Sequence, residues 1–163
     1  MLYVALLRGI GPSNPNMHGS KLCSAFEGLG FTEVSSVISS GNVVFSSLSR
    51  DAAALEAMIE RTLPERLGFT STTIIRSRNE LLALVEKDPF KGKAHGRDAY
   101  LIVSFLKDKR AVPGGAIFTA IDMARERPQD VMVRLEKRYD KAITTRTWLT
   151  VQRVLARMES ATV

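Results

Sequence analysis

The sequence predicts an α+β fold, in which a ferredoxin-like βαββαβ half with an antiparallel sheet precedes a smaller α+β half. Hydrophobic residues make up 45% of the 163 residues and charged residues 25%, as in globular chains long enough to bury a core. Over the first half, short β-branched segments and amphipathic segments follow one another in the order βαββαβ. We therefore expect a subdomain of residues 1–76 and a smaller basic subdomain of residues 77–163, packed as one compact unit.

Net charge divides the chain at nearly the same place. Residues 1–75 carry five Lys and Arg against six Asp and Glu, a net charge of −1. Residues 76–163 carry the remaining 18 Lys and Arg against 11 Asp and Glu, a net charge of +7. A basic half favours anionic partners such as phosphates or nucleic acid. Solvated helix faces rich in arginine would have the same composition, and the sequence leaves both interpretations open.

The first strand of the first half, Leu2–Arg8, is apolar on both faces, which is typical of a central strand covered on two sides. Pro64 lies inside the second helix pattern and predicts a kink or an early end there. The other segments, in order, are a helix capped by Ser20 and running to Gly28, a hairpin of Val34–Ile38 and Asn42–Ser47, a helix from Asp51 to Gly68, and a strand Thr72–Arg76.

This topology brings two glycine-containing segments together. In a βαββαβ sheet the first and third strands are antiparallel neighbours at the centre. The end of the first strand, Arg8-Gly9, is therefore expected beside the start of the third, Gly41-Asn42. Glycine at such a place leaves backbone amides open to close approach.

The second half is less regular. Ser77 and Glu80 have the spacing of a capping box that opens a helix. Pro128 suits the first turn of a later helix, and Trp148 lies on the apolar stripe of the last one, where a core role is expected. The predicted elements are a helix through Val85, strands Ala99–Leu106 and Ala116–Ile121, a helix through Tyr139, and a helix from Trp148 to Met158.

Three segments of the chain resemble an uncharacterised bacterial family, domain of unknown function 1697. They are YVALLRGI at Tyr3–Ile10, SSGNVVFSS at Ser39–Ser47 and ITTRTWLTVQRV at Ile143–Val154, with a weaker likeness at Leu29–Val34 and Asp88–Phe90. The resemblance implies a ferredoxin-like half followed by a smaller α+β half. It implies no activity, since the family has none assigned.

The chain also departs from that family. After Arg8-Gly9-Ile10 the family usually continues with Asn-Val-Gly-Gly and a basic residue, whereas this chain has Gly11-Pro12-Ser13-Asn14. The segment between Tyr100 and Thr145 is shorter than in many members. A function that resides in the loop after Ile10 would be lost or altered here.

Arg8 and its expected neighbours form the first candidate ligand site. An arginine at a strand end can hold a carboxylate or phosphate with two parallel hydrogen bonds, next to open amides. The residues nominated are Arg8, Gly9, Ser40, Gly41 and Asn42. In the alternative interpretation, Arg8 binds loop carbonyls and Ser-Gly-Asn is a tight turn.

A second candidate precedes the last helix. Thr144, Thr145 and Arg146 would place hydroxyls, amides and a guanidinium at a helix N-terminus, which is a favourable environment for an anion. The same hydroxyls would also serve a structural N-cap. The sequence does not decide between these two roles.

Recognisable catalytic and metal-binding patterns are missing from the sequence. His18 and His95 lie in polar loops without a carboxylate or cysteine at ligand spacing, so no metal site is expected. No nucleophile elbow, Walker loop or dinucleotide fingerprint occurs, and no cofactor is expected. The single cysteine, Cys23, excludes a disulfide within the chain and is expected to be buried and inert.

From these observations we expect a non-enzymatic cytoplasmic binding module for a small anionic or phosphorylated ligand. The apolar start, Leu2–Leu7, is too short for a signal peptide or a membrane span, so no membrane partner is expected. One alternative is RNA or DNA binding, although the third strand has a single aromatic residue, Phe45. Others are an enzyme with Arg8 and Arg146 as substrate clamps, and docking through an open sheet edge. The oligomeric state is left open.

Overall fold

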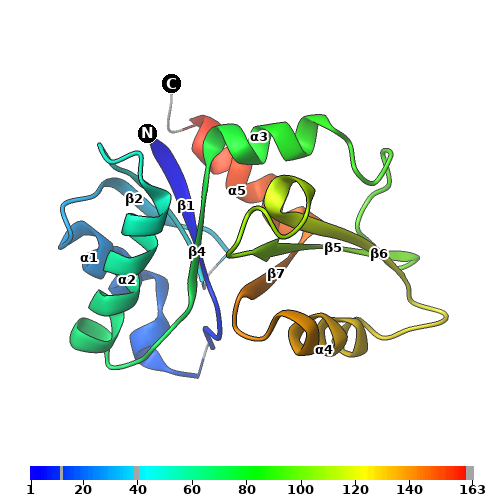
Figure 1. Cartoon of the computed structure of the whole chain (residues 1–163), viewed down its shortest axis with the longest axis horizontal. Coiled ribbons are helices and arrows are strands. Elements are labelled where there is room, and N and C mark those ends of the chain that lie inside the picture. Colours follow the sequence, from blue (N-terminus) through cyan, green and yellow to red (C-terminus); the bar gives the residue numbers. More distant parts are fainter. Residues whose placement is uncertain (12, 39–40, 161–163) are drawn as a thin grey trace.

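The computed structural model describes residues 1–11, 13–38 and 41–160, and within them two antiparallel sheets pack with five α-helices (Figure 1). The first sheet has the order β2-β3-β1-β4. Its strands are β1 (Leu2–Leu7), β2 (Thr32–Ser36), β3 (Asn42–Ser46) and β4 (Thr73–Ser77). As expected, β1 and β3 are the central antiparallel neighbours, and Leu6 of β1 lies opposite Asn42 of β3.

Helices α1 (Gly19–Glu27) and α2 (Ala52–Leu67) lie along one face of this sheet. Asp51 caps α2, as predicted, by accepting a hydrogen bond from the Ala54 N–H at 3.1 Å. The prediction of a break at Pro64 is wrong. Pro64 lies in the last turn, and the N–H of Gly68 closes that turn by donating to the Leu63 and Pro64 carbonyls. The start of α1 is also corrected: its N-cap is His18, and Ser20 lies inside the helix.

The second sheet has the order β6-β5-β7. Strand β7 was not predicted. Thr144, Thr145 and Arg146 were expected at the N-terminus of the last helix, but they lie in a strand that pairs with β5. Thr147 caps the helix that follows. The strands are β5 (Ala99–Leu106), β6 (Ala116–Asp122) and β7 (Ile143–Thr147). The helices are α3 (Arg78–Glu86), α4 (Pro128–Tyr139) and α5 (Trp148–Ser160), and 3-10 turns lie at η1 (Pro15–Met17) and η2 (Pro113–Gly115).

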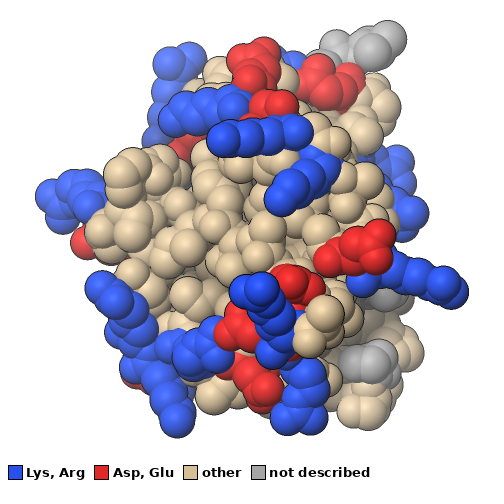
Figure 2. Space-filling model, turned by 90° about the vertical axis from the view of Figure 1, so that its right-hand side faces the viewer, with Lys and Arg blue, Asp and Glu red and all other residues tan. Residues whose placement is uncertain are grey.

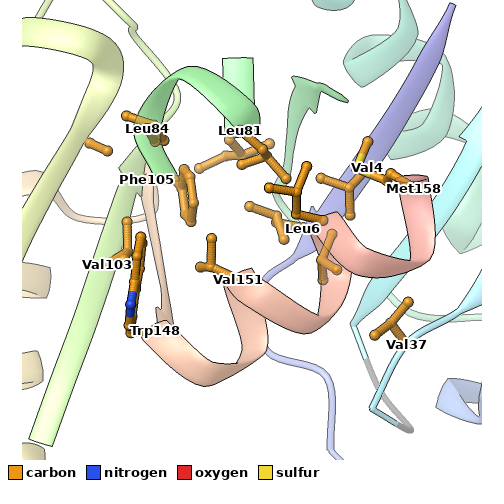
Figure 3. Close-up of a cluster of buried hydrophobic side chains, with 14 of the residues drawn as sticks. Val4, Leu6, Val37, Leu81, Leu84, Val103, Phe105, Trp148, Val151 and Met158 are labelled. Atoms are coloured by element: carbon orange, nitrogen blue, oxygen red, sulfur yellow. The ribbon is translucent and has the colours of Figure 1, made fainter. Parts of the chain in front are cut away.

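Helix α5 joins the two halves through an apolar core. Figure 3 shows Val151 and Met158 of α5 reaching Leu6 and Val4 of β1, with Phe105 of β5 beside them. The alternate side chains of β1 face α1 and α2 in a separate cluster, which confirms that β1 is covered on both sides. The sheet face that an RNA-recognition motif would use for stacking bases is therefore buried beneath α3 and α5.

Trp148, at the start of α5, is 5% exposed and packs on Phe90 with ring centroids 5.2 Å apart, so its predicted core role is confirmed. Cys23 is partly rather than fully buried. Helix α4 covers the other face of the second sheet, where Val131 meets Ile102. Among the described residues, no helix has the length and apolar character needed to cross a membrane.

Charged side chains bind the outer edge of β4. Each N–H that points away from β1 donates to a glutamate: Thr73 N–H to Glu60 at 3.1 Å, Ile75 N–H to Glu56 at 2.8 Å, and Ser77 N–H to Glu80 at 3.0 Å. Cations bind the outward carbonyls, since Lys107 donates to Thr73 O at 3.1 Å and Arg76 to Ile75 O at 2.9 Å. The open edge of the first sheet is thus satisfied without a further strand.

Glu80 completes the predicted capping box of α3, since its backbone N–H donates to Ser77 Oγ at 3.2 Å. Burial alone would raise the pKa of Glu80. The hydrogen bonds from Lys109 and the Ser77 N–H, with the charges of Lys109 and Arg76, outweigh burial and lower the pKa below its ordinary value. Folding therefore favours the ionised carboxylate.

We expect Glu80→Gln to lower stability at neutral pH and to matter progressively less as the solution is acidified. A pKa that is lowered on folding contributes stability above the ordinary value, and this contribution is lost as pH falls through the folded-state value. Urea unfolding of both proteins between about pH 7 and pH 3 measures the difference. Glu86→Gln, on an exposed position of α3, is the control; a Glu80 effect that is independent of pH would contradict this account.

Candidate functional site

A groove open to solvent lies where the end of β1 meets the loop before β4 and the loop between α4 and β7. Its volume is about 380 Å³, and an adjoining hollow of about 380 Å³ shares Glu60, Thr72 and Lys141 with it. The residues lining the groove are Arg8, Gly9, Glu60, Thr70, Ser71, Thr72 and Lys141. The second half contributes Lys141, and the first half contributes the other lining residues, so the groove lies where the two halves meet.

Backbone and side-chain bonds hold Arg8 at the rim of this groove. Its N–H donates to Thr72 O at 3.0 Å, and its carbonyl accepts from Ser71 Oγ at 2.7 Å. Its side chain, 26% exposed, crosses to the second half, where Nη1 donates to Ile143 O at 2.9 Å and lies 3.4 Å from Glu136 Oε1. Arg8 therefore links the end of β1 to the start of β7.

One edge of the Arg8 guanidinium has no partner among the described residues. In the described part of the chain its hydrogen bonds come from Nη1, and Nε and Nη2 donate to no residue. Nε–H and Nη2–H are parallel donors, and this edge of arginine matches the two oxygens of a carboxylate or phosphate. Arg8 is thus fastened to the protein by one nitrogen and leaves its bidentate edge available to a ligand.

Other groups in the groove are suited to the same ligand chemistry. Lys141 forms no ion pair with the described residues, and the hydroxyls of Thr70 and Thr72 make no hydrogen bond within them. The negative charge of Glu60 is compensated, because its carboxylate accepts from Lys107 Nζ at 2.8 Å and from a backbone N–H of β4. Lys141 is therefore the charged lining residue that has no ion pair with the described residues.

Arg146 of β7 has a different environment, which we call the Arg146 cluster. Part of the residue reaches the surface, but protein atoms enclose its guanidinium. The five hydrogen bonds of the cluster are Nε to Asn42 Oδ1 (2.7 Å), Nη1 to Thr144 Oγ1 (2.7 Å), Nη1 to Thr145 O (3.0 Å), Nη2 to Leu7 O (2.8 Å) and Nη2 to Gly41 O (3.0 Å). They use every N–H of the group.

The partners of Arg146 are neutral oxygens, and burial lowers the pKa of its guanidinium to about 10, so it remains protonated at neutral pH. An anion could bind this group only by displacing protein acceptors. Gly41 permits the close approach: its φ is +79°, and a Cβ there would lie 3.2 Å from both Arg146 Nη2 and Leu7 O. The cluster binds the two halves together.

The structure divides the residues nominated from the sequence into two groups. Arg8 and Gly9 line the groove, whereas Gly41, Asn42, Thr144, Thr145 and Arg146 belong to the Arg146 cluster. The expected neighbourhood of the first and third strands is confirmed, since Leu7 N–H donates to Gly41 O at 2.8 Å. Ser40 lies outside the described residues.

Sequence reasoning missed the groove residues Thr70, Ser71, Thr72 and Lys141. The run of three hydroxyl residues ahead of a strand was a usable signal, because hydroxyls at a strand start often meet a ligand or a turn. Lys141 carried no such signal, because its loop precedes β7, a strand that the sequence did not predict. Among the described residues, no group of three or more His, Cys, Asp or Glu side chains could hold a metal ion.

Comparison with known proteins gives the following matches. A family model described as "Protein of unknown function (DUF1697)" matches residues 1–139. The solved structure of the conserved bacterial protein SP0830 from Streptococcus pneumoniae is similar, with a TM-score of 0.72 and 18% sequence identity over 96% of this chain and 98% of that chain. At 18% identity, this similarity shows that the two proteins share a fold. None of the curated proteins searched matches the chain.

The Arg146 cluster predicts a specific loss of stability. Arg146→Lys keeps the positive charge but supplies three donors in place of five, so at least two buried acceptors lose their partner. We expect the free energy of unfolding to fall by about 2–4 kcal/mol, measured by urea titration. Arg153→Lys, on an exposed position of α5, is the matched control and should change it by less than about 0.5 kcal/mol. Equal effects of the two substitutions would refute the structural role of Arg146.

Proposed function

The chain belongs to the DUF1697 family of proteins of unknown function, and from that premise we propose that it binds a small phosphorylated or otherwise anionic ligand in the groove beside Arg8. The observation that carries the proposal is the unused Nε–Nη2 edge of Arg8. The bond from Nη1 to Ile143 O holds this edge in place before a ligand arrives. A preorganised donor pair loses less conformational entropy on binding than a free side chain would.

Each part of the groove has a role in this proposal. Arg8 holds two ligand oxygens, Lys141 supplies a second positive charge from the loop between α4 and β7, and the hydroxyls of Thr70 and Thr72 donate to the remaining oxygens. Charge-assisted bonds of this kind are stronger than neutral ones. The volume of about 380 Å³ falls in the range of small-molecule sites, so the ligand would be of metabolite size.

The groove residues favour binding over catalysis. The described lining contains neither histidine nor cysteine, and its one carboxylate, Glu60, already accepts from Lys107 and a backbone N–H. A general acid or base must exchange a proton with the substrate. Both hydrogen bonds of Glu60 end on its Oε2 and hold this carboxylate against Lys107 and β4. An enzyme clamped by Arg8 and Arg146 together has less support, because Arg146 has no donor left.

We also assign the protein to the cytoplasm. This part of the proposal rests on the single cysteine, since a chain with Cys23 alone has no disulfide to form in an oxidising compartment. Burial raises the pKa of the Cys23 thiol, so it is a poor nucleophile at neutral pH.

Thermal unfolding with added ligand tests the groove. Inorganic phosphate, a nucleoside monophosphate and a short RNA are the probes, each on wild type, Arg8→Lys and Lys141→Gln. A ligand at 100 times its dissociation constant adds about 2.7 kcal/mol, which would raise the unfolding midpoint by about 5 °C or more. We expect a phosphate-bearing compound to do so, and either substitution to weaken binding by about tenfold. Each midpoint shift is taken relative to the same variant without ligand.

Lys137→Gln, on the exposed surface of α4 outside the groove, is the matched control and should respond as wild type does. A response of Arg8→Lys equal to that of wild type would contradict the bidentate role of Arg8. A shift seen with RNA alone, and fading as salt rises, would support nucleic-acid binding instead. No shift with any probe would reject an anion site in this groove.

A further inference from the structure

The groove beside Arg8 continues into the adjoining hollow, which has a different lining. The two cavities share Glu60, Thr72 and Lys141, and each has a volume of about 380 Å³. The residues that line the hollow alone are Lys107, Tyr139, Asp140 and Ala142. A ligand held at Arg8 can therefore extend past Lys141 into this hollow, where further groups select among anionic compounds.

Asp140 supplies a carboxylate to the hollow. The residue is exposed at the end of α4, and in the described part of the chain its side chain forms no ion pair and accepts no hydrogen bond. Glu60, the other carboxylate of the lining, already accepts from Lys107 Nζ at 2.8 Å. Asp140 is therefore the carboxylate of the described lining that remains available to a ligand.

The backbone of Asp140 is strained. Its φ is +54° and its ψ is −130°, whereas an L-residue with a positive φ normally has a ψ of about +30° to +60°. These angles belong to the first central position of a type II′ turn, which the Ala142 N–H closes by donating to Tyr139 O at 3.1 Å. Glycine is favoured at that position. Strained residues of this kind gather at ligand sites, so the Asp140 side chain is expected to have a role there.

The hollow favours hydroxyl groups over a cationic amine. Lys107 and Lys141 both line it and repel a further positive charge, whereas a neutral hydroxyl can donate to Asp140 without that cost. The phenol of Tyr139 makes no hydrogen bond within the described residues and can donate to or accept from a second hydroxyl. A carboxylate binds the ribose hydroxyl of dinucleotides in the same way.

We propose that the ligand of this protein is a phosphate ester that carries neighbouring hydroxyls, as sugar phosphates and nucleotides do. This inference rests on the proposed function, because it takes the phosphate to be bound at Arg8. The carboxylate of Asp140 repels a phosphate group and accepts from hydroxyls. The ligand therefore lies with its phosphate at the Arg8 end and its hydroxyls at the Asp140 end, and Lys141 borders both.

Elsewhere on the surface, positive and negative side chains are mixed. Figure 2 shows one side of the molecule, on which Asp and Glu side chains lie among the Lys and Arg side chains. A hollow of about 430 Å³ after β6 has the same balance, with ion pairs Arg127–Asp130 at 3.2 Å and Arg134–Glu126 at 2.7 Å. Nucleic acids bind to patches or stripes of positive charge, so this mixture favours a small phosphate ester over a polymer.

Isothermal titration calorimetry of the full chain tests the proposal with ribose 5-phosphate, 2-deoxyribose 5-phosphate and inorganic phosphate. We expect wild type to bind ribose 5-phosphate at least about tenfold more tightly than either of the others, because a hydrogen bond to a charged group contributes at least that factor. Asp140→Asn removes the charge but tolerates the positive φ. It should lose most of this preference while binding inorganic phosphate at least as tightly as wild type does.

Asp140→Gly is a second variant that removes the carboxylate. Glycine adopts the backbone conformation without strain, so the thermal midpoint should not fall below that of wild type, while the preference for ribose 5-phosphate is lost. Asp98→Asn, at an exposed position before β5 and outside both cavities, is the matched control and should keep the wild-type preference.

The outcomes separate this inference from the proposed function. A wild type that binds all three compounds equally overturns the inference and leaves the anion site at Arg8 in place. Binding of none of them overturns both. A preference that survives in Asp140→Asn and Asp140→Gly overturns the inference as well, since the hydroxyls are then bound elsewhere. A nucleoside 5′-monophosphate is the fourth probe: tighter binding than that of ribose 5-phosphate identifies a nucleotide, and equal or weaker binding identifies a sugar phosphate.

Discussion

Backbone carbonyls at the strand ends, where the two sheets meet, need donors, and long cationic side chains from the opposite half supply them. Arg146 of the second half donates to Leu7 O and Gly41 O of the first. Arg76 of β4 donates in return to Leu106 O and Gly115 O of the second. Removing a charge from water is costly, and each arginine offsets that cost by satisfying several buried oxygens at once. These reciprocal bonds determine how the two sheets are placed.

The groove follows from that placement. Its walls come from the end of β1, the loop before β4 and the loop before β7, which are brought together by the arginine bonds and by α5 packing between the sheets. Arg8 takes part in the same junction, yet it commits a single nitrogen to the protein. Arg8 and Arg146 both lie at this junction, and they differ in how many of their donors the protein already uses.

The bonds between the two halves also affect how much of the positive charge of residues 76–163 can reach a binding partner. Part of the excess positive charge of residues 76–163 is directed inward: Arg146 binds carbonyls, and Lys107 binds Glu60 of α2. The positive charge available to a partner is therefore smaller than the composition suggests. Lys141 faces the groove without an ion pair to any described residue, and Arg8, although paired with Glu136, presents its Nε–Nη2 edge there.

Local pattern was enough to predict most elements and the two-sided burial of β1, because side-chain periodicity reports which faces are buried. It also placed Arg8-Gly9 beside Gly41-Asn42, since the βαββαβ order leaves one arrangement of the strands. It failed for β7, whose Thr-Thr-Arg-Thr run has no apolar alternation and is a strand because β5 pairs with it. The roles of Arg8 and Arg146 were likewise decided by tertiary structure. Arg8 donates to Ile143, which is 135 residues away along the chain, and Arg146 donates to Asn42 and Leu7, which are 104 and 139 residues away. A sequence shows that an arginine is present near a buried strand end. Which oxygens accept its hydrogen bonds depends on which strand ends meet in space.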